Sequence, residues 1–201
     1  MDKRTRNPEQ TRQRLLQAAS NEIHAHGFQG MRVDEVLRQA ALQKGAFYHH
    51  FSSKIELGYA VMEEQITPLL NRIWIEPLKD IKNPILDFPD MLARIFQTIP
   101  NEMLEHGCPL NNLAQEMASQ DKGFQARVSG LLVNWITAYT QVFKKAQKDG
   151  YVRHDVEAED IARFLVAIFE GSIGVFKAEQ SPAQWTACMS QLRLYLQALK
   201  A

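Results

Sequence analysis

The sequence predicts an all-α protein with about nine helices, in which a small N-terminal domain precedes a larger helical one. Apolar residues recur at helical spacing along most of the chain, and no segment alternates in polarity as a β-strand does. Proline and glycine separate the periodic runs. Near the N-terminus, two short helical patterns are separated by only three residues, which is a helix-turn-helix arrangement. We therefore expect domains over residues 1–53 and 54–201, with residues 54–75 as the connecting helix.

The composition limits the class of protein. The chain has 201 residues, and 45% of them are hydrophobic, which is enough for a substantial core. No apolar run reaches the length of a membrane-spanning helix, and the N-terminus has no secretory signal. The two cysteines, Cys108 and Cys188, are too few for a disulfide framework. These features favour a protein of the reducing cytoplasm that has no membrane partner.

The first helix is expected to begin at Pro8 and to end at Gly27, because proline suits a first helical position and glycine suits a helix end. Its buried stripe consists of Leu15, Leu16, Ala19 and Ile23. Four arginines in or before this helix could reach nucleic-acid phosphates, or could form a solvated arm without a fixed partner. They are Arg4, Arg6, Arg12 and Arg14.

The two short helices that follow are the most informative part of the chain. The first is expected over residues 33–40 and the second over residues 44–50, with residues 41–43 as the turn. In the second helix, Phe47 would pack inward together with Phe51. The other side of this helix presents small and basic groups, which suit the base edges and phosphates of a major groove. These groups are Lys44, Ala46 and His49.

Charge is distributed unevenly along the chain. The whole chain has no net charge, but residues 1–54 hold nine Lys/Arg and five Asp/Glu, a net charge of +4, and the remainder carries −4. A difference this small is ordinary on its own. Its position on the helix-turn-helix gives it weight, because a basic surface attracts DNA phosphates.

The second short helix and the residues after it contain a distinctive set of residues at fixed spacing, namely Gly45, Phe47, Tyr48, His50, Phe51, Ser53, Lys54 and Leu57. This set matches the pattern of, and the segment resembles, the DNA-binding domain of the TetR/AcrR family of bacterial transcriptional repressors. Three positions depart from it. Ala41 replaces a turn glycine, Gln43 replaces a capping serine, and Ala46 replaces Thr or Ser. The missing hydroxyl at position 46 leaves the base preference there open.

The resemblance implies a DNA-binding surface on and around the second helix. Tyr48 and Lys54 would anchor DNA phosphates, while Lys44, Ala46 and His49 would face the bases. Arg32 and Gln43 would add contacts to the DNA backbone. The complete predicted surface comprises Arg32, Gln43, Lys44, Gly45, Ala46, Phe47, Tyr48, His49, His50 and Lys54.

The remaining helices follow from apolar periodicity and its interruptions. The connecting helix contains Pro68, so a kink or break is expected near Thr67. Residues 76–90 read as a connection, and a helix over about 88–106 should bend at Pro100. Later helices are expected over about 110–119, 124–148, 157–176 and 182–199.

The resemblance further implies that the last two helices, about 157–177 and 182–199, form a homodimer through a four-helix bundle. Two recognition helices about 34–36 Å apart could then enter successive major grooves of a palindrome. The same two helices could instead complete the core of a monomer. The predicted interface consists of Phe164, Ile168, Gly171, Ser172, Val175, Trp185, Met189, Leu192 and Leu196.

The resemblance also implies a small-molecule pocket in the later helices. Individually, each candidate could be an ordinary core residue, but together they suggest a mainly apolar pocket. The candidates are Phe96, Met103, Cys108, Asn112, Met117, Trp135, Tyr139, Phe143 and Phe169. Cys108 precedes a predicted helix and follows His106 by two positions, which would lower the thiol pKa and suit an electrophile sensor. Its alternative role is that of a small buried residue in a tight turn.

No motif predicts catalysis, a metal or a cofactor. The close sets with ligand chemistry lack further ligands at zinc-site spacing. These sets are His24 with His26, His49 with His50, and His106 with Cys108. No phosphate-binding loop or nucleophile elbow is present either.

We therefore expect a cytoplasmic, homodimeric transcriptional repressor that binds a palindromic operator and is released by a small, mainly apolar ligand or a reactive electrophile. Such release requires the ligand to prefer one conformation over the other. Two alternatives stay open. A ligand-independent activator or architectural DNA binder would have a tightly packed body without a cavity. A small-molecule-binding all-α protein would bind no DNA.

Overall fold

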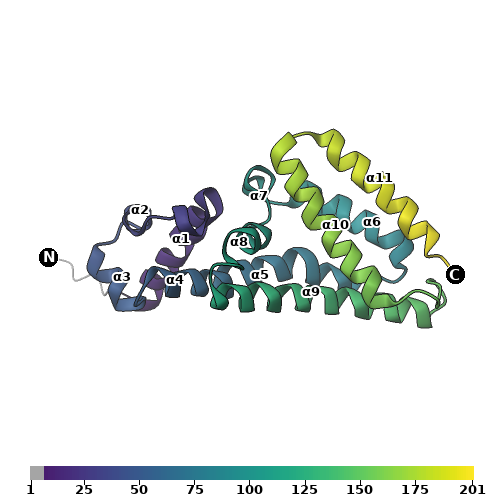
Figure 1. The fold of residues 1–201 in the computed structure, drawn as a ribbon, viewed down its shortest axis with the longest axis horizontal. Coiled ribbons are helices and arrows are strands. Elements are labelled where there is room, and N and C mark those ends of the chain that lie inside the picture. Colours follow the sequence, from purple (N-terminus) through teal and green to yellow (C-terminus); the bar gives the residue numbers. More distant parts are fainter. Residues whose placement is uncertain (1–6) are drawn as a thin grey trace. The chain divides into compact units, whose positions relative to one another are not determined.

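The computed structural model describes residues 7–201, and within this range every regular element is a helix, which confirms the all-α prediction (Figure 1). Arg4 and Arg6, two of the arginines that could reach phosphates or form a solvated arm, lie outside the described residues. The α-helices are α1 (Pro8–Gly30), α2 (Val33–Gln39), α3 (Lys44–His50), α4 (Lys54–Val61), α5 (Thr67–Leu70), α6 (Pro84–Thr98), α7 (Asn101–His106), α8 (Pro109–Met117), α9 (Lys122–Lys148), α10 (Ala158–Glu179) and α11 (Pro182–Ala198).

The described residues form two compact units. Unit 1 comprises residues 7–69 and 112–128, and unit 2 comprises residues 70–111 and 129–201. Unit 1 therefore contains the helix-turn-helix, the first part of the connecting helix, and a later segment that includes most of α8 and the first turns of α9.

Unit 1 is built around α1, which packs against α2, α3 and α4. The Asn7 side chain accepts a hydrogen bond from the Glu9 N–H at 3.1 Å and so caps the first turn of α1. Gly27 adopts φ 75° and ψ 167°, a conformation that favours glycine, and the chain then completes one more helical turn. The expected helix end at Gly27 is therefore a kink. The core is formed by Leu15, Leu16, Val36, Leu37, Phe47, Phe51, Leu57 and Val61.

A kink or a break was predicted near Thr67. No break occurs, because the helix that starts at Lys54 stays helical through Pro68. The helix widens instead into a π-helical turn, η1 (Met62–Ile66), directly before Thr67. Both the N–H and the hydroxyl of Thr67 donate to the Met62 carbonyl, the hydroxyl at 2.8 Å. A wider turn accommodates a proline that has no N–H to donate. A second π turn, η2 (Asn71–Ile75), and a 3₁₀ turn, η3 (Glu76–Asp80), complete this stretch.

The helix predicted over about 88–106 is in fact two helices, and the first begins earlier than expected. Pro84 occupies the first turn of α6, and the Asn83 side chain caps it by accepting from the Ile85 N–H at 3.1 Å. Pro89 lies inside α6, and the interruption comes at residues 99–100, before α7. The prolines at 84 and 89 therefore mark the start of a helix rather than a connection.

Unit 2 is a helical body in which α6 packs against α11, α7 packs against α10, and α10 and α11 lie side by side (Figure 1). The chain end is fixed near residue 153, because the Arg153 N–H donates to the Leu199 carbonyl at 2.9 Å. The centre of the unit is rich in aromatic side chains. Those that are fully buried are Trp74, Phe88, Trp135, Tyr139, Phe143 and Phe169.

Candidate functional site

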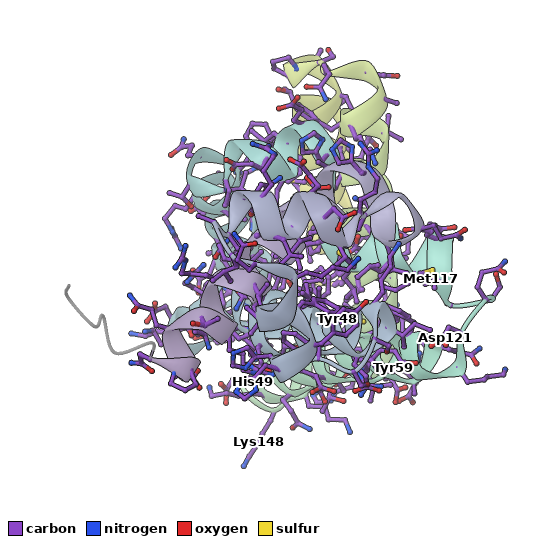
Figure 2. The ribbon with its side chains drawn as sticks, turned by 90° about the vertical axis from the view of Figure 1, so that its left-hand side faces the viewer. Tyr48, His49, Tyr59, Met117, Asp121 and Lys148 are labelled. Carbon is purple, nitrogen blue, oxygen red and sulfur yellow. The ribbon has the colours of Figure 1, made fainter. Side chains whose placement is uncertain are left out.

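The predicted recognition helix is α3, and it divides its side chains between core and solvent. Phe47 is buried, so its ring supports the helix and cannot contact DNA as the sequence-based set assumed. Tyr48 is 62% exposed, and its neighbour His49 is exposed as well (Figure 2). Ala46 is half-buried. The remaining exposed members of the predicted surface are Arg32, Gln43, Lys44 and Gly45.

Gly45 has no steric or conformational reason to be glycine within the chain. Its φ is not positive, and a Cβ built on it meets no atom within 4 Å. Glycine in a helix lowers stability by about 1 kcal/mol relative to alanine. The position is therefore suited to close approach of another molecule to the α3 backbone.

Two of the predicted DNA contacts are engaged inside unit 1. The Lys54 ammonium donates to the Gln29 carbonyl at 2.9 Å and lies 5.1 Å from the centre of the Phe28 ring. Burial lowers the Lys54 pKa, and the Glu116 charge opposes that shift. His50 is half-buried, and burial, followed by the nearby His49 and Arg12, lowers its pKa. Because an ordinary histidine pKa is already near 6.5, His50 is mainly neutral at pH 7.

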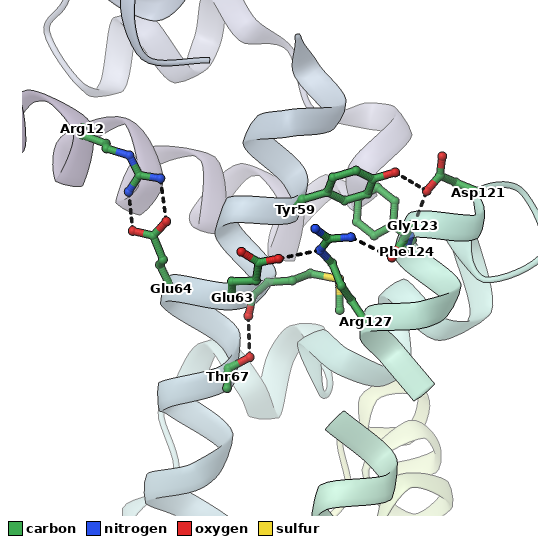
Figure 3. A network of polar contacts seen from close by, with 10 residues as sticks. Arg12, Tyr59, Glu63, Glu64, Thr67, Asp121, Gly123, Phe124 and Arg127 are labelled. Atoms are coloured by element: carbon green, nitrogen blue, oxygen red, sulfur yellow. Dashed lines mark hydrogen bonds and ion pairs between the residues drawn. The ribbon is translucent and has the colours of Figure 1, made fainter. Parts of the chain in front are cut away.

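The arginines of α1 are also used internally. Arg12 forms a two-pronged ion pair with Glu64 (Figure 3), and its guanidinium lies 5.2 Å from the centre of the Phe51 ring. Arg14 donates to the carbonyl of Ala40 at the end of α2. These two side chains therefore hold the helix-turn-helix together instead of pointing freely at a phosphate.

The turn before α3 has an unusual residue for its conformation. Ala41 has φ 48°, in the left-handed region where the family pattern has glycine. The Leu42 N–H donates to the Leu37 carbonyl at 2.9 Å and closes the turn. Ala41 therefore adopts a backbone conformation that glycine adopts more readily.

Residues 112–128 hold the helix-turn-helix from a distant part of the chain. The Glu116 carboxylate accepts from the N–H groups of Phe28 and Gln29, both at 2.8 Å, and so satisfies the turn that follows the kink. The Tyr59 hydroxyl donates to Asp121 at 2.6 Å, and the Phe124 N–H donates to the same carboxylate oxygen at 2.8 Å (Figure 3).

Arg127 completes this connection. It donates to Glu63 at 2.8 Å, and its guanidinium lies 3.9 Å from the centre of the Tyr59 ring (Figure 3). Hydrogen bonds from Tyr59 and from the Phe124 backbone lower the Asp121 pKa. No local sequence pattern predicts these pairs, because their members lie more than sixty positions apart.

Among the described residues of unit 2, the predicted pocket residues are divided between two small voids and the aromatic core. Phe96 and Met103 border a void of about 10 Å³ beside Trp74, and Trp135 borders a second void of about 10 Å³ on Trp74 as well. Each has room for one water molecule at most. Asn112 and Met117 belong to unit 1. The rings that pack around Phe88 in the core are those of Tyr139, Phe143 and Phe169.

Cys108 is not an activated thiol. It is buried, and its S–H donates to the Glu170 carboxylate at 3.2 Å. Burial and the Glu170 charge raise its pKa well above the ordinary value, although the backbone N–H groups of Asn111 and Leu110 act in the opposite direction. The helix start predicted from sequence is present, but desolvation outweighs it. The expectation of a lowered pKa is therefore wrong.

This environment makes Cys108 slow to react. We expect a thiol reagent such as Ellman's reagent to modify native Cys108 more than about tenfold more slowly than the same thiol in urea, because both access and thiolate are scarce. The rate can be followed in a Cys188→Ser variant, with Cys108→Ser as the blank. Rapid modification of the native protein at pH 7 would contradict the buried, protonated assignment.

The residues predicted for the dimer interface fall into two groups. Phe164 and Val175 are 42% and 41% exposed, Gly171 is exposed, and Ile168 is half-buried. They recur at helical spacing and form one stripe on α10, which we call the α10 stripe. Met189 on α11 is half-buried. The rest are packed inside unit 2 and cannot present their side chains to a partner. They are Ser172, Trp185, Leu192 and Leu196.

Two residues that the sequence analysis did not select are central to unit 2. Trp74 stacks on Trp135 with ring centres 4.9 Å apart, and Glu170 contacts Cys108. In the sequence, position 170 is notable only as a glutamate within the mainly apolar run that forms α10. Among the described residues, no group of three potential metal ligands occurs, and no helix is long and apolar enough to span a membrane.

An exposed recognition helix in a helix-turn-helix unit, followed by a helical body, defines a two-domain DNA-binding regulator. A family model described as "Bacterial regulatory proteins, tetR family" matches residues 15–61, and one described as "Tetracyclin repressor-like, C-terminal domain" matches residues 89–192. The chain belongs to the TetR family of bacterial transcriptional regulators.

Individual relatives agree with this assignment. The transcriptional regulator AcuR of Cereibacter sphaeroides is 30% identical, over 85% of this chain and 78% of its own. The repressor DhaR of a Mycobacterium species is 25% identical, over 85% and 84% of the two chains. A crystal structure of a regulatory protein TetR from Rhodobacter sphaeroides has a TM-score of 0.77 and 26% identity, covering 90% of this chain and 96% of that one. All three are named as regulators, not enzymes.

Proposed function

We propose that this protein is a homodimeric transcriptional repressor that binds a palindromic operator through α3 and is released from it by a small effector. The observation that carries the DNA-binding part is the exposed face of α3, with Lys44, Tyr48 and His49 around a glycine that the fold itself does not need. A helix that binds in a major groove needs its backbone to lie close to the phosphates and its basic groups to lie close to the bases.

The dimer proposal rests on the α10 stripe. Gly171 and the adjacent Gly174 lie in a helix where glycine costs stability, and a Cβ on either meets nothing within 4 Å. Exposed apolar side chains flank them. Small residues between large apolar ones permit close approach of two helices, and a second copy of α10 and α11 would cover this face.

The release proposal rests on two helices that belong to both units. Residues 109–111 of α8 and 129–148 of α9 are in unit 2, while the rest of each helix is in unit 1. Within unit 1, Glu116 holds α8 to the turn after the kink, and Asp121 and Arg127 hold α9 to α4. An effector that shifts α8 or α9 in the body would therefore change how α3 is presented to DNA.

The test is a binding titration of the full chain on the DNA that flanks its own gene, at 50 and 200 mM salt. We expect specific binding that weakens by at least about a thousandfold at the higher salt, as several phosphate contacts predict. Gly45→Ala should bind at least about tenfold more weakly while gaining up to about 1 kcal/mol of stability. Gly130→Ala is the matched control, since its position in α9 is also open. It should gain stability without losing affinity. No specific binding at either salt would refute DNA recognition.

A further inference from the structure

The centre of unit 2 contains four polar atoms that are shielded from solvent and have no hydrogen-bond partner. They are the indole N–H groups of Trp74 and Trp135, the hydroxyl of Tyr139 and the Oε2 atom of Glu170. The three aromatic residues are fully buried, and Glu170, although half-buried as a residue, has this oxygen enclosed. Buried polar groups are almost always paired, because an unpaired one costs free energy. Four in one core point to a missing partner.

These groups occupy one region of the core. Trp74 stacks on Trp135 with ring centres 4.9 Å apart, and Trp135 meets Tyr139 edge-on at 5.9 Å. Burial raises the Tyr139 pKa, and the neighbouring Trp135 partly offsets that rise. The Tyr139 hydroxyl and the Trp135 indole N–H nevertheless form no hydrogen bond with each other. The negative charge of Glu170 also raises the Tyr139 pKa. Small voids touch Trp74 on two sets of neighbours, so a ligand larger than a water molecule would bind here only if that ring moved.

We propose that this cluster is the effector site of the repressor and that its ligand is a small monocarboxylic acid, whose carboxylate accepts hydrogen bonds from Trp74, Trp135 and Tyr139. This proposal rests on the proposed function for its regulatory meaning, but the binding itself can be measured without DNA. A body that serves only as a scaffold would seal its core with apolar groups and would have no use for unpaired donors.

The donor count favours an acidic ligand over an amine. Three of the four unpaired groups are donors, and a carboxylate offers about four acceptor positions and no donor. Aromatic rings and one carboxylate could in principle hold a cation. An amine would nevertheless leave both indole N–H groups and, unless the phenol oxygen accepts, the Tyr139 hydroxyl without partners.

Glu170 adds a pH dependence to this site. Burial raises its pKa to about 7, and the Cys108 S–H, which donates to its other oxygen, partly opposes that shift. The titratable groups that face it are the Cys108 thiol from the start of α8 and the Tyr139 phenol from α9. An anionic ligand requires the neutral form of Glu170, so binding takes up a proton above pH 7. The affinity should fall by about tenfold between pH 6 and pH 8, and not rise.

The experiment is calorimetric titration of the full chain with sodium propionate, propionamide and propylammonium chloride, which share a size and differ in charge. Acetate and benzoate extend the range of ligand size. We expect a carboxylate to bind best, the amide to bind more weakly and the cation to give no heat. Repeating the titration at pH 7.5 in buffers with different ionisation enthalpies should show about three quarters of a proton taken up, since the rest of Glu170 is already protonated there.

Point variants distinguish an effect on ligand binding from an effect on the stability of the fold. Tyr139→Phe removes an unpaired hydroxyl, so it should leave thermal stability unchanged or higher while weakening the acid by at least about tenfold. Glu170→Gln should abolish the proton uptake and flatten the pH dependence. Tyr151→Phe removes a phenol hydroxyl from an exposed residue of unit 2 and should change neither quantity.

Two results would overturn the proposal. One is tighter binding of propylammonium than of any of the three acids, which would make the cluster a cation site. The other is no binding of acetate, propionate or benzoate at pH 6. Neither result would affect operator binding by the free protein, so failure of this site and failure of the DNA-binding function can be told apart.

Discussion

Replacing Gly58 by alanine is expected to lower the free energy of unfolding by about 3 kcal/mol, near the upper end for an overpacked core. A Cβ at this position would lie 2.5 Å from the Phe28 ring and 2.8 Å from the Phe124 ring. Both rings are buried and pack on each other with centres 4.7 Å apart, and Lys54 covers Phe28 as well. Neither ring can move aside without opening the core of unit 1.

Gly130→Ala is the matched control for this prediction. It makes the same chemical change in a helix, but its Cβ enters open space, so it should add up to about 1 kcal/mol of stability through helix propensity. Thermal denaturation followed by circular dichroism measures both variants. Equal stability of Gly58→Ala and Gly130→Ala would show that the contact between α4 and the two rings is not tight.

The parts of the fold that the sequence predicted correctly are those set by local signals. The bounds of α3, residues 44–50, follow from its apolar positions and from Phe51. The Ser53 side chain caps the next helix by accepting from the Glu56 N–H at 3.2 Å, which is a local effect of a serine directly before a helix. The proline rule was less reliable. It predicted an irregularity near Pro68, but it did not predict that a π-helical turn would accommodate the proline without a break.

The candidate sites were harder to predict because their partners are distant in sequence. Nothing near Glu116 indicates that it binds the backbone of Phe28 and Gln29, eighty-eight and eighty-seven positions away. The choice between the two roles of Cys108 could not be made from the sequence for a similar reason. Its local sequence favours a thiolate, while its burial and its contact with Glu170 are set by tertiary packing.

The second large effect concerns the proposed dimer. Val175→Glu is expected to weaken dimerisation by at least about a hundredfold, because a carboxylate buried without a partner costs several kcal/mol. Val175 is exposed in the single chain and follows Gly171 on the α10 stripe, so the substitution should leave the monomer fold intact. Sedimentation velocity over a concentration series measures the dimer directly, and circular dichroism checks the helix content.

Val133→Glu provides the matched control, because Val133 is an exposed valine on α9, outside the proposed interface. It should dimerise like the unmodified chain. Operator affinity should fall in Val175→Glu and stay unchanged in Val133→Glu, since one recognition helix contacts only half of a palindrome. Loss of dimer in Val175→Glu together with unchanged operator affinity would separate the two proposals: α10 would remain the contact between copies, while DNA binding would not depend on it. An unchanged dimer in Val175→Glu would place the interface elsewhere.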